Sequence, residues 1–151
     1  MDDYQFSVHV CDDLQQMAAT DSLVVPVLEG LGRNIQKQIG NVPLGTSVRI
    51  FVRDRQDRVV GGIVSDLFGG WAYISLLWID EPLRNRGLGT RLVTTLEQEA
   101  LRLGCTHAHL DTYSFEARPF YEKLGYELFA TLDDYPAGHC KYFLRKTLGQ
   151  G

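Results

Sequence analysis

The middle of the sequence reads Ile79-Asp80-Glu81-Pro82-Leu83-Arg84-Asn85-Arg86-Gly87-Leu88-Gly89-Thr90. An apolar strand pattern ends at Ile79, and the pattern of an amphipathic helix begins at Leu88. The first turn of a helix has backbone N–H groups without intrahelical partners and carries the positive end of the helix dipole. Gly87 and Gly89 add no side chains that would keep an anion from this backbone. The stretch therefore predicts a site for a phosphate or a pyrophosphate.

Positive charge is concentrated around the same glycines, although the chain as a whole is acidic. Arg84, Arg86 and Arg91 flank them, whereas the 151 residues contain 15 Lys+Arg against 19 Asp+Glu, a net charge of −4. The overall charge argues against nucleic acid as a partner. The motif is neither a P-loop, since no Lys-Ser/Thr pair follows, nor a three-glycine dinucleotide motif. The alternative to a phosphate site is a loop in which the glycines only allow a tight turn into the helix.

Outward from this stretch, the residue patterns predict the other elements of the fold. We expect strands over residues 4–10, 46–54, 59–68, 71–79, 106–112, 126–132 and 141–145. We expect one or two helices between Asp12 or Asp13 and Asn41, broken near Pro26 or residues 30–32, and further helices from Leu88 to Gly104 and over 117–124. The central three strands form an antiparallel meander. The order predicts an α/β fold with a mixed sheet, in one domain spanning residues 1–151.

The composition is that of a globular protein, with 44% hydrophobic and 23% charged residues. Cys11, Cys105 and Cys140 are scattered, which favours free thiols in a reducing compartment. The first residues lack a signal-peptide pattern, and no apolar run reaches the ~18 residues of a membrane span. We therefore expect a cytoplasmic protein without a membrane partner. His107 and His109 share a strand face but have no third ligand at useful spacing, so we expect no metal.

A second motif follows one helix and one strand later: Ser114-Phe115-Glu116-Ala117-Arg118-Pro119-Phe120-Tyr121-Glu122-Lys123-Leu124-Gly125-Tyr126. Together with the first motif, it resembles the GNAT superfamily of acyl-CoA-dependent N-acetyltransferases. The resemblance follows the order of elements along the whole chain and is most specific over residues 71–145. It implies a mixed, mostly antiparallel central sheet of about six to seven strands flanked by about four helices.

The resemblance implies a binding site for acetyl-CoA. In the family, the loop that matches this first motif holds the CoA pyrophosphate through backbone N–H groups. The end of the strand before this loop, which matches Leu77, Trp78 and Ile79, hydrogen-bonds the pantetheine arm and splays from the strand expected over residues 106–112. Ser114 stands where many members have an asparagine that contacts this arm. The cofactor-binding residues implied are Leu77, Trp78, Ile79, Arg84, Asn85, Arg86, Gly87, Leu88, Gly89, Thr90 and Ser114.

The resemblance also implies a catalytic acid. The tyrosine that matches Tyr121 commonly lies beside the cofactor sulfur, where its phenol can protonate the leaving thiolate. A phenol suits this role because it is a neutral donor at pH 7. The alternative is a core aromatic, since Tyr121 shares a helix face with Ala117 and Leu124. The implied mechanism is direct attack of a deprotonated amine on the acetyl carbonyl, without an enzyme nucleophile.

The general base is not identified by the sequence. Ser75 stands where many relatives have a glutamate, and a serine is a poor base at neutral pH. The candidates are a water chain, Glu116, Asp133, Asp134 and His139. Asp133 and Asp134 lie in a loop that flanks the acceptor entrance in the family. We expect Ser75, Asp133 and Asp134 on the acceptor side, where Asp133 or Asp134 attracts a cationic amine.

The leading functional hypothesis is transfer of an acetyl group from acetyl-CoA to a primary amine of a small, cationic molecule. One alternative is an acetyltransferase that acts on protein or peptide amines. Another is a non-catalytic acyl-CoA-binding sensor, which the departures at Ser75 and Ser114 favour. The resemblance also allows a homodimer.

Overall fold

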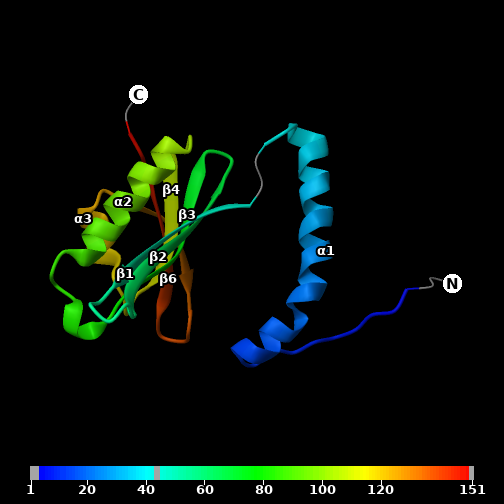
Figure 1. The fold of residues 1–151 in the computed structure, drawn as a ribbon, viewed down its shortest axis with the longest axis horizontal. Helices are drawn as coiled ribbons and strands as arrows, with labels where there is room; N and C mark the ends of the chain where they lie inside the picture. The colour runs from blue at the N-terminus through cyan, green and yellow to red at the C-terminus, as the bar shows by residue number, and fades with distance from the viewer. Residues whose placement is uncertain (1–3, 43–44, 150–151) are drawn as a thin grey trace. The chain divides into compact units, whose positions relative to one another are not determined.

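The computed structural model describes residues 4–42 and 45–149. The chain divides into two compact units, Met1–Val42 and Pro43–Gly151. The first contains α1 (Leu14–Ile39), and the second contains β1 (Thr46–Arg53), β2 (Val59–Phe68), β3 (Trp71–Ile79), the 3-10 turn η1 (Glu81–Leu83), α2 (Leu88–Arg102), β4 (His107–Tyr113), α3 (Arg118–Lys123), β5 (Glu127–Asp133) and β6 (Cys140–Thr147) (Figure 1).

Helix α1 is one continuous helix. Its N-cap is Asp13, one of the two predicted caps, whose Oδ1 accepts a hydrogen bond of 2.8 Å from the Gln16 N–H. The predicted break near Pro26 or residues 30–32 is wrong, because the helix continues through Pro26. A proline removes one helical hydrogen bond, and a glycine such as Gly30 costs about 1 kcal/mol against alanine, so neither need end a long helix. The helix ends at Gly40, which has a φ of 80°.

The predicted strand over residues 4–10 is also wrong. These residues have no regular secondary structure, and their side chains are exposed. An alternating pattern describes a strand with one buried face, but a strand also needs a partner that completes its backbone hydrogen bonds. The pattern alone does not supply that partner.

The six strands form a single mixed sheet in the order β1-β2-β3-β4-β6-β5. The pairs β1–β2 and β2–β3 are antiparallel, which confirms the predicted meander. Strands β3 and β4 are parallel, and β6 pairs antiparallel with both β4 and β5. The mixed, mostly antiparallel sheet is therefore confirmed, with six strands. Three α-helices and η1 lie within the described residues, where about four helices were expected.

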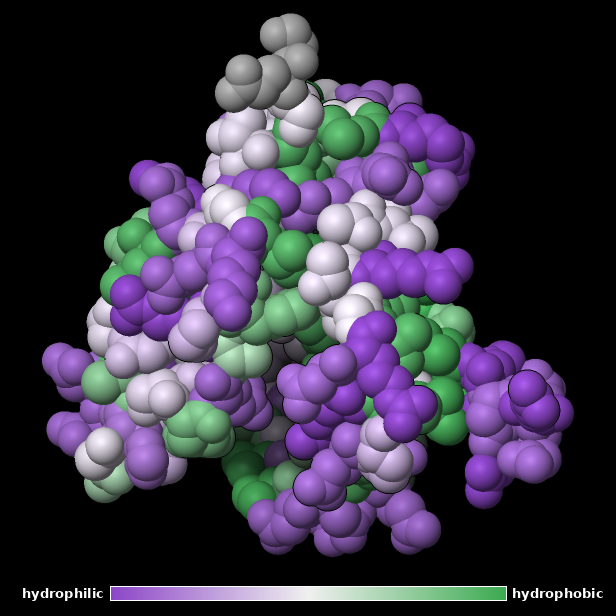
Figure 2. Space-filling model, turned by 90° about the vertical axis from the view of Figure 1, so that its left-hand side faces the viewer, coloured by the Kyte–Doolittle hydropathy of each residue, from purple (hydrophilic) through white to green (hydrophobic). Residues whose placement is uncertain are grey.

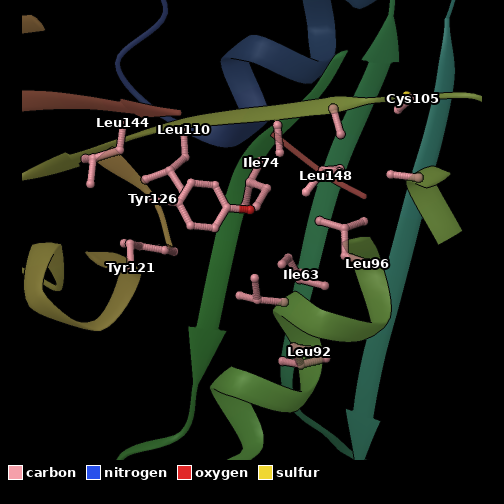
Figure 3. Packing of buried hydrophobic residues seen from close by; sticks show 14 of the residues in the cluster. Ile63, Ile74, Leu92, Leu96, Cys105, Leu110, Tyr121, Tyr126, Leu144 and Leu148 are labelled. Carbon is pink, nitrogen blue, oxygen red and sulfur yellow. The ribbon is translucent and has the colours of Figure 1, made fainter. Parts of the chain in front are cut away.

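Helices α2 and α3 lie on the same side of this sheet (Figure 1). The apolar stripe predicted for α2 is buried, with Leu92, Val93, Leu96 and Ala100 facing the core. These side chains pack against buried residues of the strands, among them Ile63, Ile74, Leu110 and Leu144 (Figure 3). Full burial of a leucine or valine contributes roughly 1.5–3 kcal/mol, so this stripe accounts for much of the attachment of α2.

A partly buried charge pair fixes α2 to the far strands of the sheet. Glu97 accepts hydrogen bonds from Lys146 Nζ at 2.9 Å and from the Tyr126 hydroxyl at 3.1 Å. A half-buried carboxylate is tolerated when its oxygens are paired in this way. The contact joins α2 to β6 and to the residue that precedes β5.

The side of the molecule that carries α2 and α3 is largely hydrophilic, with smaller hydrophobic areas between the polar side chains (Figure 2). Among the helices of residues 4–42 and 45–149, none has both the length and the apolar character that crossing a membrane requires.

Ser65 gives a test of the packing of the core. Its hydroxyl is fully buried and has no hydrogen-bond partner within the described residues. We expect Ser65→Ala to raise the free energy of unfolding by about 1 kcal/mol, because an unpaired buried hydroxyl carries a desolvation cost that the methyl group does not. Urea unfolding followed by circular dichroism measures this change.

Ser47→Ala is the matched control. The Ser47 hydroxyl donates to the Ser65 carbonyl at 3.2 Å, so its removal should leave stability unchanged or lower. A Ser65→Ala variant less stable than the wild type would show that this hydroxyl has a partner after all.

Candidate active site

The sheet opens between its two parallel strands. The ladder between β3 and β4 contains four residue pairs, from Trp71↔His107 to Ile74↔Leu110, and then ends. Beyond it, β3 continues to Ile79 paired only with β2, and β4 continues to Tyr113 paired only with β6. The expected separation of these strands is confirmed. It leaves backbone N–H and C=O groups on the two facing edges without ladder partners.

A β-bulge at Ser75 marks the start of the opening. Val64 of β2 pairs with Leu76 and Ser65 pairs with Ile74, so Ser75 is the extra residue of β3. Its hydroxyl donates a hydrogen bond of 3.3 Å to the Val64 carbonyl. Bulges bend a strand and redirect its side chains, and they are common next to active sites.

The three predicted strand-end residues lie beyond the bulge. Leu77 and Ile79 pack against the core, whereas half of the Trp78 side chain is exposed. The Ile79 carbonyl accepts a hydrogen bond of 3.0 Å from Arg84 Nε. Gly61 lies opposite this end, where a Cβ atom would be 2.8 Å from the Ile79 Cδ1 and 3.0 Å from the Trp78 carbonyl oxygen. The absence of a side chain at Gly61 therefore lets β2 lie close to the end of β3.

The loop after β3 leads directly into the start of α2. Asp80 caps η1 by accepting a hydrogen bond of 2.9 Å from the Glu81 N–H. Asn85 and Gly87 then adopt positive φ angles of 61° and 78°. Gly87 is the N-cap of α2 and supplies no side-chain cap, so the first N–H groups of the helix remain available. A Cβ atom at Gly87 would meet nothing within 4 Å, which shows that the approach is open.

Gly89 has a packing role of its own. A Cβ atom at this position would lie 3.2 Å from Cζ of Phe120, which is tighter than an ordinary contact. The glycine therefore lets the first turn of α2 lie close to the Phe120 ring of α3. The two glycines of the motif thus serve different purposes, an open helix start and a close contact between helices.

The other side chains of this motif are mostly exposed. Arg84, Asn85, Arg86, Thr90 and Arg91 face solvent, and Leu88 is partly buried. Within residues 4–42 and 45–149, the three arginines form no ion pair closer than 4.0 Å. Their positive charge is therefore available to an anion at the start of α2.

Ser114 joins the end of β4 to the start of β6. Its Oγ accepts a hydrogen bond of 3.0 Å from the Cys140 N–H and lies 3.4 Å from His139 Nδ1, and its own N–H donates to the Cys140 carbonyl at 2.8 Å. Two residues later, Glu116 accepts a hydrogen bond of 3.4 Å from the Thr112 hydroxyl. The hydroxyl of Ser114 is thus already engaged within the protein.

Tyr121 is a member of the core and also a protonated phenol. Its side chain is buried on α3 beside Tyr126 (Figure 3). Its ring is edge-on to those of Phe120 and Tyr126. Burial, followed by the negative charges of Glu116 and Asp111, raises the pKa of Tyr121 to about 12. The packing role and the acid role are compatible, because the burial that places the ring also keeps its proton in place.

A polar cluster that the sequence did not predict lies on the sheet face away from α2. The Tyr73 hydroxyl donates to Asp111 at 2.7 Å, and Lys141 lies 3.4 Å from the same carboxylate. Asp111 is the first residue of β4 beyond the last pair with β3, so this carboxylate borders the opening. Burial, followed by the bond to Asp111, raises the pKa of Tyr73 to about 12. An aspartate inside a strand, where it is rare, is the signal that sequence reasoning had available.

His107 and His109 lie on this same face, as predicted. The ring of His107 stacks on Trp71 at 4.5 Å, and that of His109 stacks on Tyr73 at 4.8 Å. Burial lowers the pKa of His109. The two rings therefore belong to an aromatic row across the start of β3 and β4.

An open recess of about 380 Å³ lies near the carboxyl end of β4. We call it the aromatic recess; its walls are Tyr113, Phe115, Asp134, Tyr135 and Pro136. Of the two predicted acceptor-side aspartates, Asp134 lines it directly. The neighbouring Asp133 instead contacts Cys140, whose Sγ lies 3.6 Å from its Oδ1. Asp134 therefore lines the recess, whereas Asp133 contacts Cys140, and the sequence alone did not predict this difference.

Comparisons with known proteins agree with this architecture. The family model described as the acetyltransferase (GNAT) family matches residues 28–126. The chain is 37% identical over 91 residues to a blasticidin-S acetyltransferase of Streptomyces morookaense, covering 60% of this chain and 67% of that one. It is 28% identical to the acetyltransferase Atu2258 of Agrobacterium fabrum, over 91% of this chain and 93% of that one.

A solved structure shows the same fold over nearly the whole length. It is the 1.9 Å crystal structure of an acetyltransferase from Bacillus cereus ATCC 14579, with a TM-score of 0.71 and 26% identity. The alignment covers 94% of this chain and 98% of that one.

Proposed function

This chain belongs to the acetyltransferase (GNAT) family and is an acetyl-transferring enzyme; on that premise we propose that it moves an acetyl group from acetyl-CoA to a primary amine of a small, cationic molecule. The observation that carries the proposal is the opening between β3 and β4, which has the uncapped start of α2 at one end and carboxylates on the face away from α2. The relative named for blasticidin-S supports a small-molecule acceptor.

The residues present fit acetyl-CoA. An anion can approach the N–H groups of residues 88–90, because Gly87 offers no side chain and open space surrounds it. Arg86 and Arg91 add positive charge for the phosphates. The free edge of β3 at residues 77–79 can hydrogen-bond the amides of the pantetheine arm. Acetyl-CoA supplies the activated acetyl group as a thioester.

The chain itself provides positioning and a proton. Beyond Ile74 and Leu110 the facing edges of β3 and β4 have backbone groups without ladder partners, at which donor and acceptor can be aligned without covalent attachment to the enzyme. Unpaired N–H groups at the bulge can stabilise negative charge that develops on the acetyl oxygen. Tyr121 holds its proton at Oη, from which it can neutralise the departing sulfur.

The acceptor side carries the opposite charge. Asp134 at the aromatic recess and Asp111 at the edge of the opening attract a cationic amine and receive its proton, directly or through water. Ser75 does not take the role of base, because its hydroxyl is a donor to the Val64 carbonyl. We further propose that residues 1–151 serve this one activity, and the coverage of the Bacillus cereus structure supports it.

A thiol-release assay with acetyl-CoA and a panel of amines, aminoglycosides and peptides tests the acceptor class. We expect turnover with small cationic amines and a higher acceptor KM in Asp134→Asn. If only peptides were acetylated, the proposed small-molecule acceptor would be wrong and the chain would be a protein or peptide acetyltransferase. Binding of CoA without any turnover would replace it by a sensor.

Arg91→Glu should weaken CoA binding. We expect the Kd to rise about tenfold, which corresponds to ~1.4 kcal/mol, because the substitution places a negative charge beside the start of α2. Isothermal titration calorimetry measures it. The control is Arg102→Glu in the last turn of the same helix, and an equal loss in both variants would rule out a local phosphate site.

Tyr121→Phe should lower kcat by about 100-fold, the range of a general acid, while the protein stays folded. Since the pKa of Tyr121 is raised to about 12, its phenol stays protonated across the working range, and the wild-type kcat should show no loss of this acid below roughly pH 10. Stopped-flow measurement of thiol release gives both quantities.

Tyr126→Phe is the matched control, because its ring contacts that of Tyr121 but its hydroxyl is bonded to Glu97. It should lower stability and leave kcat unchanged. An unchanged kcat in Tyr121→Phe would leave Tyr121 with the packing role alone.

A further inference from the structure

The aromatic recess narrows the class of acceptor. We propose that it holds a planar aromatic or heteroaromatic ring of the acceptor molecule, so that the substrates are amines that carry such a ring. This inference rests on the proposed amine acetylation and adds the part of the acceptor that does not react. It follows from the arrangement of the ring walls, their exposure, the position of Lys141 and the location of the recess on the sheet.

The walls of the recess are stacked rings. Phe115 lies 5.1 Å from Tyr113 with an interplanar angle of 2°, and Tyr135 lies 5.7 Å from Tyr113 at 22°. The outer two remain accessible, with Phe115 55% exposed and Tyr135 41% exposed. A further flat ring can extend the stack at either end, and each aromatic pair contributes about 0.5–1.5 kcal/mol beyond the area it buries.

Hydrogen bonds preform the recess. In the β5–β6 loop, the Tyr135 N–H donates to the His139 carbonyl at 3.0 Å, and the His139 N–H donates to the Pro136 carbonyl at 2.8 Å. The His139 ring also lies edge-on to Phe115, 5.0 Å between centroids. The walls therefore come from two segments that are already tied together, so little ordering is needed when a ligand ring arrives.

The charges favour a neutral ring over a cation in contact with the walls. An aromatic cluster can also bind a cation, but Lys141 already takes that position, with its Nζ 4.7 Å from the Tyr135 centroid and 5.9 Å from that of Tyr113. A second cation against the same rings would be repelled by this ammonium group. The cationic part of the acceptor belongs instead at the rim, beside the carboxylate of Asp134.

The recess also lies on the face from which the acceptor would approach. Tyr113 is the last residue of β4, one of the two strands that border the opening, and it shares a strand face with Asp111. The alternate residues Leu110 and Thr112 are buried beneath α2 and α3. A ring stacked on this face therefore occupies the side of the sheet opposite α2 and α3. Its volume of about 380 Å³ lies within the usual range of small-molecule sites, roughly 300–1,000 Å³.

Two amines with the same reactive group test the inference. Benzylamine and cyclohexylmethylamine both present a primary amine on one methylene, but only the first has a flat ring. With the full chain and saturating acetyl-CoA, and with KM expressed as the concentration of unprotonated amine because benzylamine is the weaker base, we expect kcat/KM to favour benzylamine by about 3–10-fold, as one stacked aromatic pair predicts. Saturation-transfer NMR measures binding of the same two amines independently of turnover.

Variants identify the wall that is responsible. Tyr135→Leu and Phe115→Leu should reduce the preference to about 1–2-fold by raising the KM for benzylamine, whereas Tyr135→Phe should keep it. Phe68→Leu is the control, because Phe68 is also an exposed aromatic residue, 45% accessible, but lies at the far end of β2. It should leave the preference unchanged.

The outcomes separate this inference from the proposed function. Equal kcat/KM for the two amines, or equal binding of both by NMR, overturns the ring site while amine acetylation stands. A preference that Phe68→Leu removes as fully as Tyr135→Leu also overturns it. Preferential binding of benzylamine that Tyr135→Leu abolishes, without turnover of any amine, supports the ring site and overturns the proposed acetylation of small amines.

Discussion

The end of the ladder between β3 and β4 is the constraint on which the site depends. Four parallel pairs hold the strands together, and after Ile74 and Leu110 each strand is held only from outside, by β2 or by β6. Because both outer ladders continue, each strand keeps its backbone hydrogen bonds on its outer edge beyond the point where the two strands separate. The unpaired edges, the bulge at Ser75 and the carboxylate of Asp111 all lie at this one place.

The opening separates two surfaces of different chemistry. The loop into α2 offers uncapped N–H groups and arginines to an anion, whereas the face away from α2 carries carboxylates and aromatic rings. The net charge of −4 is therefore the sum over a surface that attracts anions and a surface that carries carboxylates. The proposed transfer from an anionic donor to a cationic acceptor would use this division, because each substrate is attracted to the surface of opposite charge.

Local patterns predicted the parts of the fold that depend on near neighbours in the chain. The bounds of β2 and β3 and the buried stripe of α2 follow from period-two and helical spacing, with glycines at the turns. The strand over residues 4–10 and the break near Pro26 were wrong, because they depend on a partner strand and on the cooperativity of a long helix. Tyr73, Asp111 and Lys141 were missed because they come from three strands, and only the register brings them together.

By itself, the sequence determined the family, the order of most elements and the glycine-rich entry to α2, since these are written in contiguous motifs. Only the tertiary structure decided which residues face one another. It gave Gly89 a packing partner in Phe120, engaged Ser114 with Cys140, and distinguished Asp134 from Asp133. The physical reason is that a contact between distant residues depends on strand register and helix docking, which are set by the whole core and not by any one segment.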